Sequence, residues 1–452
     1  MKTERDRPPS WSVQRLFSRV KHSGKPLVPI SVFAIVVGCL GLAAHIVILV
    51  LAGNNPVGSL SGVSDQARYY ALSQSILQGR GLSYAGVPTA LRPPLYPILL
   101  AAAQIGFGPH YAIVVRLFQF LICLALASVA GHLASRLFGA EARLTGIALA
   151  LALPTLMFIT TELQTEALTA FITGLFLYFM LSEIKSTHAQ GLGMGASAGV
   201  AMLLRFNSAL LFIIGATVCV WPLRNAKRAI VVCTTAGIII APWVIRNAKV
   251  FNGSILYSSH GGINLLEGVL TPSGRAQNAE TERIRAAVGW VHTDIETNDE
   301  SRLNYPREDQ LDRQARLAAI QAWASMGWKS RLRLLASKVA YFWLSTDQLL
   351  ATRSFSPAQR LLRAIGVFGY WVVLALAIVG WGRLMRIDRS SAGMIAFYAA
   401  FVTAAHLPFV MNTRLRIPFM DFLLVVLAAG GISTLAKRAN GTRTNEEQGT
   451  HL

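Results

Sequence analysis

The feature that most constrains the fold of this chain is a series of long apolar blocks without charged residues. The first block, Leu27 to Leu51, runs for 25 residues with no Lys, Arg, Asp or Glu. A helix needs roughly 20 residues to cross the hydrocarbon core of a bilayer. Comparable blocks recur up to Leu435, and only 14% of all residues are charged, against about 25% in an ordinary soluble domain. A single soluble core could not bury so many blocks, so the pattern predicts an all-α polytopic membrane protein.

The blocks predict about ten transmembrane helices, with a margin of two. They lie near residues 27–51, 111–137, 143–160, 167–183, 192–204, 208–222, 229–245, 361–382, 391–410 and 417–435. The fifth and sixth are short and could form one broken hairpin. The first block is too long for a signal-peptide core, and no small-residue cleavage pattern follows it, so we expect an uncleaved span.

Basic residues predict the orientation in the membrane. The net charge of +20 gathers in short connections at alternate ends of the predicted spans, for example at Arg136, Arg143, Arg383, Arg386 and Lys437. Such connections stay in the cytoplasm, so we expect a cell inner (plasma) membrane protein with both termini cytoplasmic. Anionic lipid headgroups, and not nucleic acid, are the expected counter-charge. The four cysteines lie inside apolar blocks without CxxC spacing, which argues against structural disulfides and a zinc site.

This organisation predicts five regions and two extracytoplasmic loops with interfacial helices. The regions are a basic cytoplasmic tail (1–26), an N-terminal transmembrane region (27–245) with a first outer loop (53–110), an extracytoplasmic loop region (246–360), C-terminal transmembrane helices (361–435) and a polar cytoplasmic tail (436–452). The second outer region holds half of the 22 acidic residues. Apolar spacing there predicts a helix from Glu308 to Ala324. The basic and then aromatic stretch Lys329 to Leu350 predicts an interfacial helix or a partly inserted segment.

The first outer loop has the features of a site pressed onto the membrane. Ser64 or Asp65 can cap a helix that stops at Gly79. The segment from Leu91 to Pro97 contains three prolines, which interrupt backbone pairing before a short apolar helix that reaches Gly108. At membrane depth such backbone is tolerated only where protein or a water-filled cavity covers it.

Three segments, in this order along the chain, resemble the GT-C glycosyltransferases. The first combines Asp65-Gln66-Ala67-Arg68-Tyr69-Tyr70, Gly79-Arg80-Gly81 and Arg92-Pro93-Pro94-Leu95-Tyr96-Pro97. The second combines Pro242-Trp243-Val244-Ile245-Arg246-Asn247 with Gly261-Gly262-Ile263-Asn264-Leu265, and the third is Arg414-Leu415-Arg416-Ile417-Pro418. The resemblance covers nearly the whole chain. It is nearest to the branch of dolichyl-phosphate-mannose protein mannosyltransferase-like and bacterial lipid A aminoarabinose transferase-like proteins.

The resemblance implies an inverting glycosyltransferase that takes its sugar from a polyprenyl-phosphate carrier on the extracytoplasmic face. The acidic residue typical of the first outer loop in this family maps onto Asp65, the expected catalytic base, although Asp65 could also be only a helix cap. A second acidic position maps onto Glu162 and Glu166, which are expected to bind the acceptor or to position a divalent cation. Many members have two adjacent acids in the first loop, whereas here Gln66 follows Asp65. The acceptor, an envelope glycan, lipid or protein, does not follow from the resemblance.

Arginines are the expected partners of the departing phosphate, because a guanidinium pairs with phosphate oxygens in a planar fork. Arg92, Arg246, Arg414 and Arg416 are all predicted at the outer interface. Arg246 and Arg416 rank first, since they lie in segments that resemble the family. Arg205 has weaker support. Each of these side chains could instead extend to lipid headgroups.

The remaining candidates are aromatic and histidine side chains and one glycine pair. Tyr69, Tyr70 and Tyr96 could stack on a sugar, although interfacial tyrosines ordinarily form the aromatic belt. His406 is predicted on the same side, where a histidine near a helix end is more often structural. Gly261-Gly262 either brings backbone N–H groups near a phosphate or forms a turn.

Two other functional classes remain open from the sequence. A multi-pass transporter or lipid flippase of envelope biosynthesis would carry polar residues near the middle of the bilayer, whereas here they gather in the outer loops. A non-catalytic assembly factor would keep the fold without the activity. No Walker loop, Rossmann fingerprint or serine-hydrolase elbow occurs, which argues against nucleotide-driven chemistry.

Overall fold

The computed structural model describes residues 28–54, 64–84, 86–182, 184, 186–221, 225–271, 308–346 and 357–449. Within these ranges the secondary structure is helical except for one antiparallel hairpin, β1 (Ser83–Tyr84) and β2 (Val87–Pro88). The all-α class is therefore confirmed. The predicted cytoplasmic tail 1–26 and the acidic stretch 272–307 of the second outer region lie outside the described residues.

The helices follow the order of the predicted spans. They are α2 (Val28–Ala52), α5 (Tyr111–Phe138), α6 (Ala142–Ala152), α7 (Pro154–Thr161), α8 (Glu166–Leu181), α9 (Thr187–Leu204), α10 (Ala209–Val220), α11 (Ala226–Val250), α16 (Pro357–Ile387), α17 (Arg389–His406) and α19 (Phe422–Gly449).

Among the described residues, five helices are long and apolar enough to cross a membrane: Ser31–Ala52, Leu95–Phe138, Ala226–Val250, Ala364–Ile387 and Thr413–Arg438. The bent pair α6 and α7 makes a sixth if it counts as one span. The multi-pass architecture is confirmed, and the count of about ten spans stays a prediction.

The bend between α6 and α7 has its cause in Pro154. The preceding Leu153 is extended, with φ −72° and ψ 114°, because the proline ring disfavours a helical conformation at the residue before it. The two helices meet at 53°. The predicted span 143–160 is thus two helices, and α7 ends at Thr161, from which a short turn (162–165) leads into α8.

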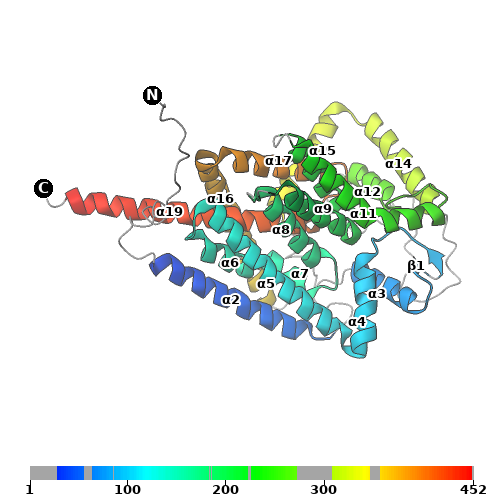
Figure 1. Ribbon diagram of the computed structural model, residues 1–452, viewed down its shortest axis with the longest axis horizontal. Helices are drawn as coiled ribbons and strands as arrows, with labels where there is room; N and C mark the ends of the chain where they lie inside the picture. The colour runs from blue at the N-terminus through cyan, green and yellow to red at the C-terminus, as the bar shows by residue number, and fades with distance from the viewer. Residues whose placement is uncertain are drawn as a thin grey trace, which may run out of the picture.

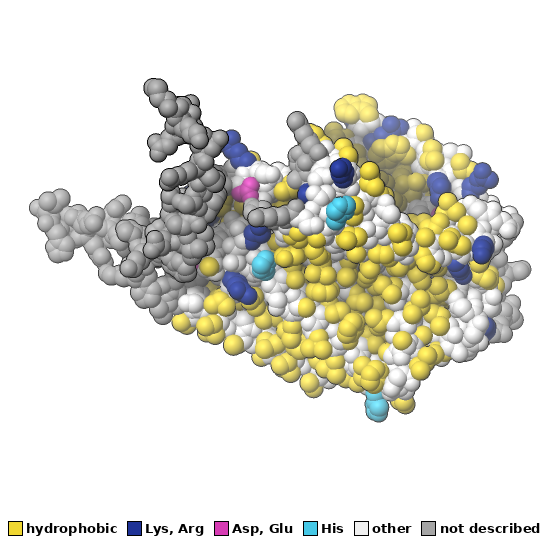
Figure 2. Space-filling model, viewed as in Figure 1, with side chains coloured by type: hydrophobic (Ala, Val, Ile, Leu, Met, Phe, Trp, Pro, Cys, Tyr) yellow, Lys and Arg dark blue, Asp and Glu magenta, His cyan; other side chains and the backbone are white. Residues whose placement is uncertain are grey.

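The long helices pack in a bundle whose ends differ in character. α16 packs along α19, α9 along α11, and α6 against both α2 and α5. In Figure 1 the start of α2 and the end of α19 lie at the left, while the hairpin and the helices of the first outer loop lie at the right. The middle of the visible face is covered by hydrophobic side chains, with arginine and lysine side chains towards its left and right margins (Figure 2). Exposed apolar side chains such as Val32, Leu40, Leu121, Ile238 and Phe368 are what a lipid-facing surface requires.

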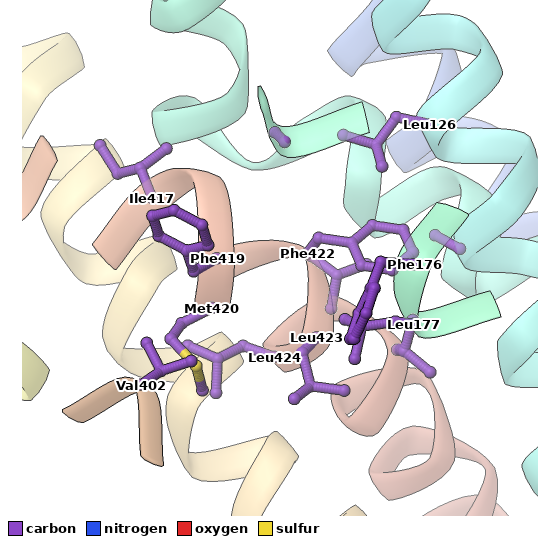
Figure 3. Close-up of a cluster of buried hydrophobic side chains, with 14 of the residues drawn as sticks. Leu126, Phe176, Leu177, Val402, Ile417, Phe419, Met420, Phe422, Leu423 and Leu424 are labelled. Atoms are coloured by element: carbon purple, nitrogen blue, oxygen red, sulfur yellow. The ribbon is translucent and has the colours of Figure 1, made fainter. Parts of the chain in front are cut away.

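The main core surrounds the beginning of the last long helix. A π-helical turn, η6 (Ile417–Asp421), connects the short helix α18 (Thr413–Arg416) to α19. Its buried side chains lie together with those of α5, α8, α17 and α19 (Figure 3): Leu126, Phe176, Leu177, Val402, Ile417, Phe419, Met420, Phe422, Leu423 and Leu424. Because close-packed side chains leave little freedom to move, this core fixes the backbone that carries Arg414 and Arg416.

The outer loops form helices as predicted. The first contains α3 (Ser64–Leu77) and α4 (Leu95–Phe107), and the second contains α12 (Gly261–Leu270), α14 (Glu308–Ser325) and α15 (Trp328–Leu344). Gly79, which ends the α3 segment, has φ +74°, a conformation that favours glycine. The predicted helix Glu308 to Ala324 is thus confirmed. The segment from Lys329 to Leu350 is helical up to Leu344, and whether it lies in the interface or is partly inserted stays a prediction; its residues 347–350 lie outside the described residues.

Candidate active site

Asp65 lies in the first turn of α3, and arginines engage both of its carboxylate oxygens. Oδ2 accepts a hydrogen bond from Nη1 of Arg414 at 2.9 Å, and Oδ1 accepts one from Nη2 of Arg92. Nη1 of Arg68 lies 3.8 Å from Oδ1. Burial alone would raise the pKa of the Asp65 carboxyl, but Arg92, Arg414 and Arg68 outweigh it and hold that pKa well below its usual range. The carboxylate is therefore ionised at neutral pH.

Glu166, the first residue of α8, supplies the second carboxylate of the cluster. Its Oε1 accepts a hydrogen bond from Nε of Arg414 at 2.8 Å and pairs with Nη1 of Arg205 at 2.8 Å. Arg414 thus bridges Asp65 and Glu166. The Glu166 side chain is 4% exposed, and its other oxygen, Oε2, is buried without a hydrogen-bond partner among the described residues.

The turn 162–165 is fixed to its surroundings by two glutamine amides. Gln66 donates from Nε2 to the Glu162 carboxylate, and its Oε1 accepts from the N–H of Leu163 at 3.2 Å. Gln119 donates from Nε2 to the carbonyl oxygens of Thr160 and Glu162, each at 2.8 Å. The residue that departs from the acidic pair of the family pattern, Gln66, therefore anchors the turn that carries Glu162 to α3.

Two of the tyrosines predicted to line the site, Tyr69 and Tyr96, pack against each other close to Arg92. Tyr69 and Tyr96 pack edge to face, with ring centroids 5.1 Å apart, and the guanidinium of Arg92 lies 6.0 Å from the Tyr69 centroid. The Tyr96 hydroxyl donates to Oε1 of Gln119 at 2.8 Å. Tyr70 is 38% exposed and takes no part in these contacts. Tyr69 and Tyr96 thus support the cluster from the buried side.

Arg416 lies in a buried ion pair away from this cluster. Its Nε pairs with Oδ1 of Asp421 at 2.9 Å, and both side chains are fully buried. Nη1 donates to the carbonyl oxygens of Phe342 and Ser345 at 3.1 and 2.8 Å, and the ring of Tyr370 lies 4.1 Å from the guanidinium carbon. These contacts join α18 to α15 and α16, so Arg416 holds the helices together.

Arg246 likewise binds backbone. Its Nη1 and Nη2 donate to the carbonyl oxygens of Thr89 and Leu82 at 2.8 and 2.9 Å. The two arginines that the family-like segments ranked first are therefore engaged elsewhere. The structure brings Arg92 and Arg414 to Asp65 instead.

Arg205 had only weak support as a sequence-based candidate, and Arg68 was not singled out. Arg68 follows Asp65 by three residues, and this spacing places both on one face of a helix, a signal that could have been used. Arg205 had no local signal, because its contact with Glu166 joins the end of α9 to the start of α8.

His406 and the glycine pair have structural contacts. Nδ1 of His406 lies 2.7 Å from the carbonyl oxygen of Val402, and Nε2 lies 3.0 Å from Nδ2 of Asn207. The N–H of Gly262 donates to Oδ1 of Asp312 at 2.5 Å. Gly261-Gly262 thus begins α12 and packs it against α14; it forms neither a turn nor, in these contacts, a phosphate-binding loop.

The part of the chain that the structure describes contains no group of three or more His, Cys, Asp or Glu side chains placed to hold a metal ion. The space between Asp65 and Glu166 contains the guanidinium of Arg414. The role of a divalent cation at this site stays a prediction.

The fold and part of the sequence match known proteins. Residues 92–245 match the family described as dolichyl-phosphate-mannose-protein mannosyltransferase. The archaeal oligosaccharyltransferase AglB from Archaeoglobus fulgidus, in complex with an inhibitory peptide and a dolichol-phosphate, has a similar fold, with a TM-score of 0.52 and 14% identity. The match covers 92% of this chain and 52% of AglB, about half its length. ArnT from Cupriavidus metallidurans bound to undecaprenyl phosphate matches with a TM-score of 0.37 and 18% identity over 89% of this chain and 79% of that chain. No curated protein sequence matches significantly.

The arrangement of helices is therefore similar to that of AglB, and about a third of the chain matches the mannosyltransferase family. More particularly, the segment that matches the mannosyltransferase family contains Arg92, Glu162, Glu166 and Arg205 of the cluster described above. These findings do not favour a transporter or lipid flippase.

Proposed function

We propose that this protein transfers a sugar from a polyprenyl-phosphate carrier to an acceptor hydroxyl, with inversion, on the extracytoplasmic face of a cytoplasmic membrane. The observation that carries the proposal is a cluster in which four guanidiniums face two carboxylates: Arg68, Arg92, Arg205 and Arg414 with Asp65 and Glu166. Positive charge is in excess there, which suits an anionic ligand. The dolichol-phosphate in the AglB complex supports a lipid phosphate as that ligand.

The Asp65 carboxylate accepts hydrogen bonds from N–H groups of Arg92 and Arg414. The phosphate of the sugar carrier would accept hydrogen bonds from the same N–H groups. On donor binding, these guanidiniums turn towards the phosphate oxygens, for which their planar forks are suited. Asp65 is then free to accept a hydrogen bond from the acceptor hydroxyl. Donor binding therefore precedes deprotonation in this mechanism.

The transfer itself is an in-line displacement. The acceptor oxygen forms a bond to the anomeric carbon while its proton moves to Asp65. The bond between the anomeric carbon and the phosphate oxygen breaks, and its electron pair leaves with the lipid phosphate. Arg92 and Arg414 stabilise the negative charge that develops on that phosphate.

Glu166 is the proposed contact for a hydroxyl of the acceptor or of the sugar. Its Oε2 is buried without a partner among the described residues, and a buried carboxylate oxygen without a hydrogen bond is costly. A substrate hydroxyl would supply the missing donor. Glu162 lies on the same turn and is held by Gln66.

The proposed orientation rests on the basic residues. Arg136 and Arg383 lie in or near the last turns of α5 and α16, at the end of the bundle away from α3, and Lys437 of α19 pairs with Glu141, which precedes α6. If this end is cytoplasmic, Asp65 faces the extracytoplasmic side of an inner (plasma) membrane. The five-region division of the chain given above remains part of this proposal.

The test is a cell-free transfer assay with purified protein, a panel of radiolabelled polyprenyl-phosphate sugars and an envelope extract. Asp65→Asn is expected to reduce transfer by about 10²- to 10⁴-fold, the usual contribution of a general base. Asp388→Asn is the matched control, since Asp388 caps α17 through the N–H of Ser391 at 3.1 Å and does not contact the cluster.

The outcomes separate the parts of the proposal. Transfer by wild type and by Asp388→Asn, with loss in Asp65→Asn, supports it. Full transfer by Asp65→Asn would show that Asp65 is not the catalytic base, while the proposed sugar transfer would still be supported. No transfer by folded wild type across the panel overturns the reaction, and a lipid-flipping assay then tests the transporter alternative.

A further inference from the structure

The backbone of segment 89–92, which precedes α4, is bound by charged side chains from two different helices. The carbonyl oxygen of Thr89 accepts from Nη1 of Arg246 at 2.8 Å, and the N–H of Ala90 donates to Oε2 of Glu308 at 3.0 Å. Thr89 and Ala90 are buried, at 1% and 0% exposed. Water therefore cannot replace these two hydrogen bonds if either side chain is removed.

Further hydrogen bonds extend both contacts. The hydroxyl of Ser259 donates to Oε2 of Glu308 at 2.8 Å, and the N–H of Ser259 donates to the carbonyl oxygen of Ala90 at 3.3 Å. Nη2 of Arg246 donates to the carbonyl oxygen of Leu82 at 2.9 Å. The same guanidinium thus binds the backbone before and after the β1–β2 hairpin.

The side chains of the segment are held as well. Ala90 lies in an apolar cluster with Trp243 of α11. Leu91 packs against a second cluster, formed by α12 and α14, that includes Ile263 and Leu311. Main chain and side chains of the segment are therefore fixed up to the residue before Arg92.

We infer that Glu308 and Arg246 are positioning residues for Arg92: they hold the backbone of segment 89–92 so that the Arg92 guanidinium reaches Asp65. The inference rests on the proposed function, in which Arg92 binds the donor phosphate. Neither side chain touches the substrate in this arrangement. Loss of either leaves buried backbone groups unpaired and lets the segment shift, and a shift of about 1 Å in a positioned group can cost as much as 10²-fold in rate.

A double-mutant cycle tests whether Glu308 acts through Arg92. Glu308→Ala is expected to lower kcat/KM for the donor by about 10- to 100-fold. In an Arg92→Ala background the same change is expected to have an effect of less than about twofold, because residues that act as one unit are not additive. If the loss of kcat/KM in the double variant equals the product of the losses in the two single variants, the inference is overturned.

Asp312→Ala is the matched control for the cycle. Asp312 is one turn further along α14, is as buried as Glu308, at 5% against 6% exposed, and also accepts a backbone N–H, that of Gly262. Among the described residues, the Asp312 carboxylate accepts hydrogen bonds from Gly262 and Arg316 and not from segment 89–92. Its removal is expected to lower stability while kcat/KM for the donor stays within about twofold of wild type.

Hydrogen–deuterium exchange of the purified protein gives a readout that needs no substrate. Glu308→Ala is expected to increase exchange in the peptide containing residues 89–92, Asp312→Ala in the peptide that begins α12, and Glu308→Gln, which keeps an acceptor oxygen, in neither. Unchanged protection of residues 89–92 in Glu308→Ala overturns the inference even in an active enzyme. Increased exchange there, in a protein that shows no transfer at all, would instead count against the proposed function and leave the contact between α14 and this segment established.

Discussion

At the scale of single residues, Arg414 is the group that joins the two carboxylates of the site. Its Nη1 binds Asp65 at 2.9 Å and its Nε binds Glu166 at 2.8 Å. One guanidinium can do both because its five N–H donors point in fixed, divergent directions. An ammonium group carries the same charge as a compact point on a flexible stem and cannot match both directions.

Arg414→Lys is therefore expected to impair the enzyme although it conserves charge. The expected loss in kcat/KM is about 10²- to 10³-fold, comparable to removal of one preorganised donor from a charge-stabilising site. The measurement is the transfer assay. Arg383→Lys is the control and should retain activity, because among the described residues Nη1 of Arg383 donates to the hydroxyls of Ser433 and Thr434, each at 3.2 Å, away from the cluster. Equal activity of the two variants would contradict the bridging role.

Glu308 gives a prediction about pH. Burial raises the pKa of the Glu308 carboxyl above its ordinary value of 4.5, and hydrogen bonds from Ala90 and Ser259 only partly offset it. A raised folded-state pKa contributes stability that is present below the unfolded pKa and is lost as the pH rises through the folded pKa. A glutamine at this position does not ionise, so Glu308→Gln does not lose stability in this way as the pH rises. The melting temperature of Glu308→Gln, relative to wild type, should therefore rise as the pH increases above the ordinary pKa of 4.5. A relative melting temperature that falls as the pH increases would contradict the raised pKa of Glu308.

The sequence identified Asp65, Arg92 and Arg414 as candidates but could not order the arginines. It placed Arg246 and Arg416 first because they lie in family-like segments. The partner of a guanidinium depends on which element folds against it. The backbone carbonyl oxygens next to Arg246 are a consequence of tertiary packing, and the local pair of Arg416 with Asp421 depends on the π turn between them. Regular helix spacing along the chain therefore reveals neither contact.

At the scale of elements, two helices approach each other closely through glycines. A Cβ atom at Gly380 of α16 would meet the carbonyl oxygen of Leu427, and one at Gly431 of α19 would meet that of Leu376. Small residues let helices in lipid approach until their backbones touch, which replaces the hydrophobic driving force that is absent there. The α16–α19 pair in turn supports η6 and the helix that carries Arg414.

Gly380→Ala is expected to destabilise the protein by about 1–3 kcal/mol, the usual cost of overpacking. The control is Gly382→Ala on the same helix, where an added Cβ would meet nothing within 4 Å. Thermal unfolding of both variants in the same detergent is the measurement. A similar melting temperature for the two would show that the close crossing does not limit stability.

Helix positions were largely predictable from the sequence, whereas departures from regular geometry were not. The prolines before Leu95 correctly marked the start of α4, because proline is tolerated at a helix start and not within its interior. Pro154 lay within a predicted span, and its bend was not anticipated. The π turn at Ile417–Asp421, which contains Pro418, was also unforeseen.

At the scale of the whole molecule, the candidate site and the ends of α5 and α19 lie at opposite ends of the bundle. The α3 helix with Asp65 lies at one end in Figure 1, and the ends of α5 and α19 lie at the other. The predicted number of spans depends on how short helices are counted. α10 has 12 residues and rises about 18 Å, less than the hydrocarbon thickness of about 30 Å.

The orientation can be tested by labelling single cysteines in a variant that lacks the four native ones. Gln310, exposed on α14, and Arg389, at the start of α17, are suitable positions. A membrane-impermeant maleimide should label Gln310→Cys in intact cells and Arg389→Cys only after permeabilisation, because positively charged connections stay cytoplasmic. The reverse pattern would place Asp65 in the cytoplasm and overturn the proposed orientation.

The pairing of Asp65 with Arg414 has a consequence for biosynthesis. The two residues are 349 positions apart, and a ribosome adds roughly 5–20 residues per second. Asp65 therefore enters the membrane on the order of tens of seconds before its partner has been made. During that interval the nascent chain has the first outer loop but no complete phosphate site. Under the proposed function, sugar transfer can begin only after the part of the chain that carries Arg414 has been made and inserted, so the completion of the site is also the step that switches the activity on.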